Sequence, residues 1–163
     1  MKKNIVIVSL NDFIMKEVCL LLAKKLNMNF VDIDTLIEKE LLANKGESLN
    51  IANDYLSSLE RRIIQKVVGQ TNSVLSISAE TYLANNHIDY FHETNLIYLQ
   101  TTVHSIDVNL IKNKAERTRI EQNTTLHENL NEFLMNSSNS VVENADVKDI
   151  KEIVKEIEQL INV

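Results

Sequence analysis

The chain has 163 residues, and a sequence of this length is expected to fold as one domain over residues 1–163. It carries 17 Lys and Arg against 23 Asp and Glu, a net charge of −6 with no basic cluster, which argues against nucleic acid as a partner. No apolar run approaches the roughly 18 residues needed to cross a bilayer, and one cysteine, Cys19, excludes an internal disulfide, so we expect a cytoplasmic protein with no membrane partner.

Short apolar runs, which are typical of buried strands, alternate along the chain with segments of helical periodicity. This alternation predicts an α/β fold, a three-layer sandwich with a five-stranded, mainly parallel sheet and helices on both faces. The polar segment 113–123 has no period and predicts a loop. In chain order we predict a strand over residues 5–8, a helix over 13–26, a strand over 30–32, helices over 36–43 and 49–68, strands over 73–77 and 95–99, helices over 103–111 and 126–135, a strand over 140–143 and a last helix over 147–161.

Glycine and histidine usage limits the possible sites. The chain has no proline and two glycines, Gly46 and Gly69, so few loops with positive φ are expected.

The histidines are scattered among polar neighbours with no spacing typical of a metal site. We therefore expect surface positions without a special role for His87, His92, His104 and His127.

The segment over residues 4–38 resembles the N-terminal quarter of shikimate kinases. Its most specific part is FVDIDTLIE at 30–38, and VLSIS at 74–78 and LIYLQ at 96–100 fall where the third and fourth strands of that family lie. The spacing extends the resemblance over nearly the whole chain. It implies a P-loop kinase fold with a mobile lid near 113–123, and transfer of the γ-phosphoryl group of ATP-Mg to the 3-hydroxyl of shikimate.

The phosphate-binding loop of that family has the motif G-x-x-x-x-G-K-[ST], in which glycines let backbone N–H groups converge on the phosphates. Here the motif positions carry Ser9, Ile14, Met15 and Lys16, and Asp12 replaces a further glycine. A non-glycine residue in the left-handed region costs about 1–2 kcal/mol, and Asp12 adds a carboxylate beside an anion site. Lys16 lies one residue late, about 100° around a helix. The loop is therefore predicted to hold no ATP phosphate.

The same loop contains two possible helix caps. Ser9 and Asp12 have the spacing of a capping box, and Asp12 alone is also placed to cap a helix that starts at Phe13. Either arrangement predicts a closed loop, with Phe13 and Ile14 folded toward the sheet.

The resemblance also implies changes in the substrate half of the site. The glycine triplet of the family corresponds to Ser-Ala-Glu at 78–80, and an arginine that binds the substrate carboxylate corresponds to Ser57. A second arginine falls near Leu130, whereas Glu60 matches a retained glutamate. Loss of guanidinium forks removes a bidentate carboxylate clamp.

Three further acidic or basic positions match the family. Asp32 and Asp34 match an aspartate pair, of which one member assists the metal and the other contacts the substrate hydroxyls. Arg117 matches a lid arginine, although Thr118 replaces the proline that follows it. Asp34 is equally placed to cap the helix over 36–43. For Arg117, a solvated charged loop is favoured over a lid.

Three functions are compatible with these residues. The favoured hypothesis is a degenerate shikimate kinase-like protein without ATP or metal, retained as a binding or scaffold module for a protein partner or a homodimer. The second is an active shikimate kinase with an unusual nucleotide site, in which Asp32 assists Mg²⁺. The third is a small-molecule sensor that keeps Asp34 as its contact. The loss of both phosphate and substrate anchors favours the first.

Overall fold

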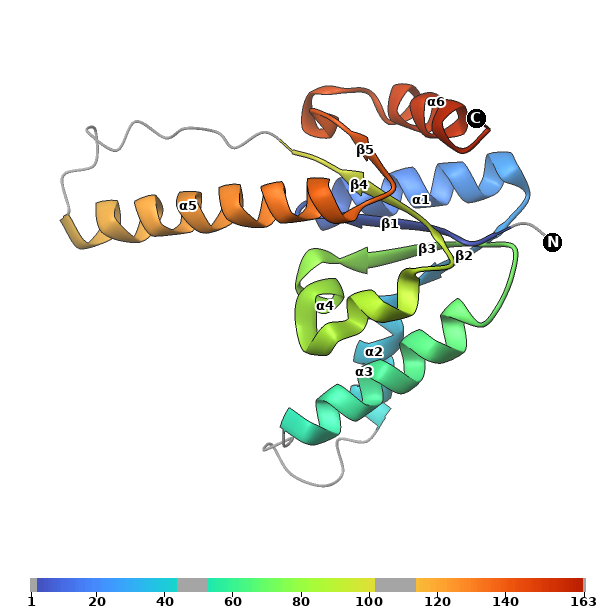
Figure 1. Cartoon of the computed structure of the whole chain (residues 1–163), viewed down its shortest axis with the longest axis horizontal. Coiled ribbons are helices and arrows are strands. Elements are labelled where there is room, and N and C mark those ends of the chain that lie inside the picture. The colour runs from blue at the N-terminus through green and yellow to red at the C-terminus, as the bar shows by residue number, and fades with distance from the viewer. Residues whose placement is uncertain (1–2, 44–52, 102–113, 163) are drawn as a thin grey trace.

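The computed structural model describes residues 3–43, 53–101 and 114–162. Within these ranges, five strands form one parallel sheet in the order β2-β3-β1-β4-β5 (Figure 1), which confirms the predicted fold class. Each strand lies within one residue of its predicted bounds. The strands are β1 (Ile5–Ser9), β2 (Asn29–Asp32), β3 (Ser73–Ser78), β4 (Asn95–Leu99) and β5 (Ser140–Val142).

Helices cover both faces of the sheet, as predicted. On one face lie α1 (Asp12–Leu26) and α6 (Ile150–Ile161), and Figure 1 shows them side by side above the strands. The other face carries α2 (Ile33–Ala43), α3 (Asn53–Val68), α4 (Ala79–Leu83), the 3₁₀ helix η1 (Ala84–Phe91) and the end of α5 (Lys114–Ser137). A second short 3₁₀ helix, η3 (Ala145–Val147), precedes α6.

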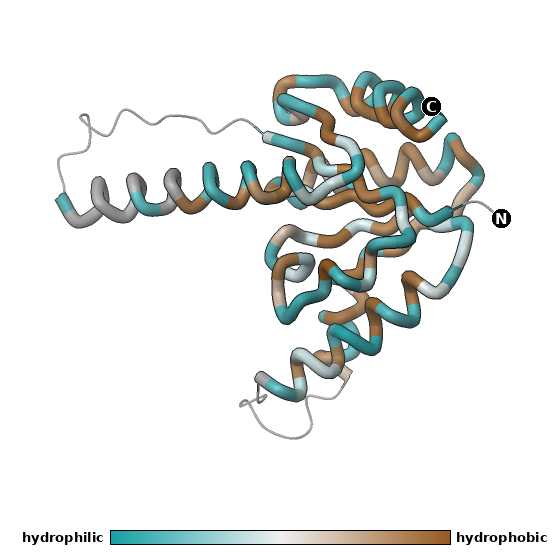
Figure 2. The backbone as a smooth tube through the Cα atoms, in the orientation of Figure 1, coloured by the Kyte–Doolittle hydropathy of each residue, from teal (hydrophilic) through white to brown (hydrophobic). Residues whose placement is uncertain are grey.

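Two apolar cores result, one on each face. Successive residues of a strand point to opposite faces, so Val6 and Val8 enter the core under α2 and α3 while Ile5 and Ile7 enter the core under α1 and α6. All five residues of β1 are buried. The hydrophobic colour of the central strands in Figure 2 reflects this burial on both faces, which is typical of parallel sheets.

The helices differ from their predicted bounds where apolar periodicity is weak. Residues 114–123, predicted as part of a loop, belong to α5, because strong helix formers such as Lys, Ala, Glu and Arg favour a helix without an apolar stripe. The N-terminal part of α5 extends beyond the sheet (Figure 1). The predicted helix over 103–111 lies outside the described residues. α6 starts at Ile150, three residues later than predicted, because Asp149 caps it by accepting from the Lys151 amide at 2.8 Å.

Asparagine replaces glycine in the tight turns of this chain. The expectation of few positive-φ positions is wrong, because five non-glycine residues in the described ranges have φ near +50 to +60°, and all of them are asparagine. Asparagine tolerates the left-handed region better than other side chains. The five are Asn27, Asn72, Asn85, Asn86 and Asn144. Asn27 is the C-cap that ends α1.

Candidate functional site

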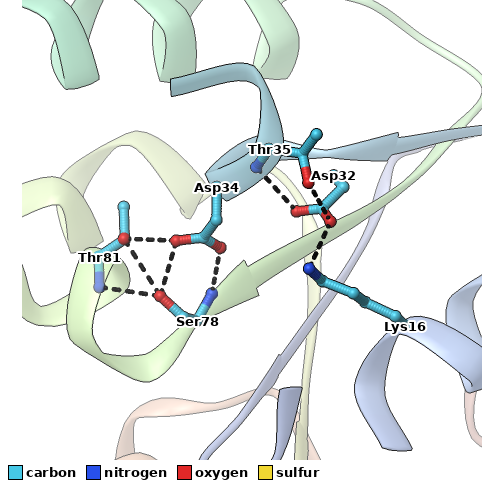
Figure 3. Close-up of polar contacts among 6 residues, drawn as sticks. All are labelled: Lys16, Asp32, Asp34, Thr35, Ser78 and Thr81. Atoms are coloured by element: carbon cyan, nitrogen blue, oxygen red, sulfur yellow. Dashed lines mark hydrogen bonds and ion pairs between the residues drawn. The ribbon is translucent and has the colours of Figure 1, made fainter. Parts of the chain in front are cut away.

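The candidate site lies at the carboxyl edge of the sheet, where β1, β2 and β3 end. In parallel α/β sheets this edge is the usual position of ligand sites. Asp32 ends β2, Asp34 is in the first turn of α2, and Ser78 ends β3. Lys16, from α1, points toward the same edge (Figure 3). The structure therefore brings together residues from three regions of the chain, namely α1, the junction of β2 with α2, and the end of β3.

The segment between β1 and α1 is closed by its own side chains. Ser9 is fully buried, and its hydroxyl donates to the Leu99 carbonyl at 3.0 Å and accepts from the Asn11 amide at 3.1 Å. Asn11 is the N-cap of α1, because its Oδ1 accepts from the Ile14 amide at 3.2 Å. The predicted caps were therefore wrong: α1 begins at Asp12, and Asn11 caps it.

The first turn of α1 also differs from the prediction. Phe13 is 74% exposed, so it does not fold toward the sheet, whereas Ile14 packs against the core under α1. Met15, at the lysine position of the motif, is fully buried in that core. Because the next residue points about 100° further around the helix, Lys16 faces the sheet edge instead.

Lys16 and Asp32 form an ion pair with 3.0 Å between Nζ and Oδ2. Burial opposes ionisation of Asp32, but hydrogen bonds from Thr35 and Lys16 outweigh it and lower its pKa. The hydrogen bond to Asp32 in turn raises the pKa of Lys16. The Thr35 amide donates to Asp32 Oδ1 at 3.3 Å, so the capping role predicted for Asp34 belongs to Asp32.

Asp34 faces α4 rather than its own helix. Its Oδ2 accepts from the Ser78 amide at 2.7 Å, and its Oδ1 accepts from the Ser78 hydroxyl at 2.7 Å and the Thr81 hydroxyl at 2.6 Å (Figure 3). Ser78 is the N-cap of α4, and its hydroxyl accepts from the Thr81 amide at 3.3 Å. Asp34 is thus held by three donors at the start of that helix.

Carboxylates dominate the electrostatics of this edge. Burial is the largest cause that raises the pKa of Asp12, and Asp34 adds to it, while Lys16 acts in the opposite direction. Asp32 and Glu80 also raise it. The ammonium of Lys16 therefore stands beside four carboxylates of the described residues, so an anion bound at this edge needs a further cation to balance its charge.

One residue that the sequence analysis assigned to the surface is buried. His87 is 1% exposed, and its Nδ1 lies 2.8 Å from the Thr81 carbonyl, so Nδ1 carries a proton and donates. Its Nε2 lies 3.7 Å from Oε2 of the buried Glu60. No sequence signal indicated this contact, because it forms only when η1 packs against α3. The side chain of His92 is 72% exposed, as predicted, and His104 lies outside the described residues.

The buried His87 predicts a stability effect. We expect His87→Leu to lower the free energy of unfolding by about 1–3 kcal/mol, because it removes the bond to Thr81 and leaves that carbonyl without its side-chain donor. His92→Leu is the control and is expected to change it by less than about 0.5 kcal/mol. Urea unfolding followed by circular dichroism measures both. Equal effects of the two variants contradict a paired role for His87.

Other predicted site residues belong to other helices than Asp34. Ser57 is on α3 and Leu130 on α5, both half-buried, and Arg117 is also part of α5. Among the described residues, no group of three or more His, Cys, Asp or Glu side chains is arranged to hold a metal ion. No helix in the same ranges is long and apolar enough to cross a membrane.

The sheet order, the helix that follows the central strand and the acidic residues at the carboxyl edge define the class of α/β small-molecule kinases. The sequence model described as "SKI: Shikimate kinase" matches residues 17–162. The chain belongs to the shikimate kinase family. The match begins directly after the altered loop at residues 9–16.

Curated relatives and solved structures agree with this family. A shikimate kinase of Sulfurihydrogenibium sp. (strain YO3AOP1) is 31% identical over 147 residues, covering 84% of each chain. One of Persephonella marina is 32% identical over 111 residues, covering 63% of each. The shikimate kinase structure from Bacteroides thetaiotaomicron has a TM-score of 0.71 at 15% identity and covers 99% of both chains. That from Acinetobacter baumannii, in complex with shikimate, has a TM-score of 0.69 at 16% identity, covering 99% of this chain and 93% of that one.

These comparisons correct the favoured functional hypothesis. The sequence analysis predicted a non-catalytic binding or scaffold module, but the family match and both curated relatives are shikimate kinases, and nothing in them indicates a degenerate branch. The hypothesis rested on the changes in the loop over residues 9–16 and on the loss of the substrate anchors, among them Ser57 at an arginine position. Similarity over the rest of the chain supports the active-kinase alternative instead.

Proposed function

We propose that this protein is a phosphotransferase of the shikimate kinase type, which transfers the γ-phosphoryl group of ATP to a hydroxyl of shikimate or a close relative. The observation that carries the proposal is the convergence of Asp32, Asp34 and Lys16 at one edge of the sheet in a chain of this family. Two carboxylates and one ammonium are the groups that orient a hydroxyl and attract a phosphate.

On the acceptor side, Asp34 is the residue that matches the contact to the substrate hydroxyls. A carboxylate that accepts a hydrogen bond from a hydroxyl increases the electron density on its oxygen and takes the proton as the bond to phosphorus forms. Such positioned bases contribute roughly 10²–10⁴-fold to rate. The fixed orientation of Asp34 supports this role.

On the donor side, the backbone cradle that the family uses for ATP phosphates does not fit this chain. The Asn11 amide donates a hydrogen bond to the Ser9 hydroxyl, and the Ile14 amide donates one to the Asn11 side chain. Two N–H groups of the loop are therefore already hydrogen-bonded within the protein and do not face a phosphate. We therefore derive no step through that cradle. Among the described side chains at this edge of the sheet, the half-exposed ammonium of Lys16 is available to a phosphate.

Lys16→Met tests the donor side. In a coupled assay with ATP-Mg and shikimate, we expect wild-type turnover and a loss of kcat/KM for ATP of at least about tenfold in the variant, since one charge-assisted contact is worth about 1.5–3 kcal/mol. Lys25→Met is the matched control: Lys25 is on the same helix, is equally exposed, and also forms a 3.0 Å ion pair, with Glu158. Absence of wild-type turnover, or equal losses in both variants, refutes this assignment.

A further inference from the structure

The donors around Asp34 divide its two oxygens unequally. Oδ1 accepts two hydroxyl donors, from Ser78 and Thr81, at 2.7 and 2.6 Å. Oδ2 accepts one, the Ser78 amide, at 2.7 Å. A carboxylate has about four lone-pair positions, two on each oxygen. Oδ1 is therefore fully used, and Oδ2 keeps one position for a further donor.

We infer that Ser78 and Thr81 are positioning residues, which hold the Asp34 carboxylate so that Oδ2 receives the acceptor hydroxyl. This inference rests on the proposed function, because it assigns Asp34 to that hydroxyl. Neither hydroxyl touches the substrate; each acts through Asp34. The arrangement fixes both the rotation of the carboxylate and the oxygen that takes the proton, and orientation of this kind is a large part of catalytic efficiency.

The hydroxyl of Ser78 is itself held in place. It accepts from the Thr81 amide, which directs its hydrogen away from that amide and toward Asp34. Thr81 is itself held in place within α4, because its carbonyl accepts a hydrogen bond from the buried His87. A side-chain donor whose own partners are fixed loses little entropy when it holds a carboxylate.

A merely structural role is the competing explanation, since a carboxylate near the start of a helix stabilises the helix. The two roles differ in what they change. A structural contact affects unfolding alone, whereas a positioning contact affects kcat and leaves KM for shikimate nearly unchanged. Variants that remove one hydroxyl without changing shape separate the two.

The test compares Ser78→Ala, Thr81→Val and the conservative Thr81→Ser in the coupled assay with shikimate and ATP-Mg. We expect kcat to fall about tenfold in each of the first two, the effect of one lost hydrogen bond of about 1.4 kcal/mol, with KM for shikimate changed by less than about twofold. Thr81→Ser keeps the hydroxyl and is expected to retain kcat within about twofold. Thr94→Val is the matched control, because it removes another buried threonine hydroxyl, bonded to the Phe91 carbonyl at 2.7 Å, that precedes β4 at the opposite edge of the sheet.

A second measurement does not depend on turnover. In urea unfolding, the midpoint shift of the double variant Asp34→Ala with Thr81→Val is expected to be smaller than the sum of the two single shifts, because both remove the same bond. Additive shifts overturn the inference, as does an unchanged kcat in Thr81→Val while the wild type turns over. A wild type without turnover refutes the proposed function itself, and the inference then falls with it.

Discussion

Asp34→Asn is expected to lower kcat on shikimate by about 10²–10⁴-fold, the range that one positioned acid–base group contributes. The amide is isosteric with the carboxylate but takes no proton. It also places an NH₂ group among donors, because both oxygens of Asp34 accept hydrogen bonds, from the Ser78 amide and from two hydroxyls. With its NH₂ at the Oδ2 position the amide faces the Ser78 N–H, which is also a donor, and with its NH₂ at the Oδ1 position the two hydroxyls must turn to accept instead of donate.

The measurement is steady-state kinetics at saturating ATP-Mg, with unfolding curves to confirm that the variant is folded at the assay temperature. Asp54→Asn is the matched control, since Asp54 is likewise an acidic residue in the first turn of a helix, α3, but is exposed. It changes only the helix-dipole contribution and is expected to leave kcat within about twofold. A kcat of Asp34→Asn within about threefold of the wild type contradicts the role of Asp34 as the base.

Met15→Lys is expected to destabilise the protein strongly, although it restores the lysine at its usual position in the phosphate-loop motif. Met15 is fully buried in the core under α1, between that helix and the sheet. Burial lowers the pKa of a lysine by up to about 3–5, which corresponds to about 4–5 kcal/mol at pH 7, because the penalty stops growing once the lysine is neutral. Total stabilities of single domains are about 5–15 kcal/mol, so a large part of the fold's stability is lost.

Urea unfolding of Met15→Lys and Met15→Leu measures this effect. The leucine variant conserves volume and polarity and is expected to cost less than about 1.5 kcal/mol. Activity is not expected to rise in Met15→Lys, because the side chain points into the core and not toward Asp32. A lysine variant that unfolds within about 1 kcal/mol of the wild type indicates that α1 begins in a different register from the one seen here.

The strands of this protein were predictable because burial on both faces leaves a local trace. Parallel strands covered by helices on each side are nearly continuous apolar runs, and residues 5–8 and 95–99 show this plainly. The family was also recognisable from FVDIDTLIE at 30–38, and the family model confirms it. The strong apolar stripe of α6 identified that helix, although its start depended on the Asp149 cap.

The functional interpretation was wrong because it gave the altered loop and the missing substrate anchors more weight than the similarity of the rest of the chain. Whether Met15 or Lys16 faces the sheet edge depends on where α1 starts. Asn11 fixes that start as the N-cap, because its side chain accepts a hydrogen bond from the Ile14 amide. A shift of one residue rotates every side chain of a helix by about 100°. Motif alignment alone assigns residues to positions and does not give this rotation.

Contacts between elements far apart in the chain were decided only by the tertiary structure. Asp34 lies 44 residues from Ser78 and 47 from Thr81, and the three meet because β2 and β3 are parallel neighbours whose carboxyl ends share one edge. His87 is buried for a similar reason, since η1 packs against α3 and places His87 beside Glu60.

Local sequence determines which strands and helices form, because apolar periodicity and caps act over a few residues. The partners of a polar side chain depend on which elements the sheet order places next to one another, and no local pattern records that order.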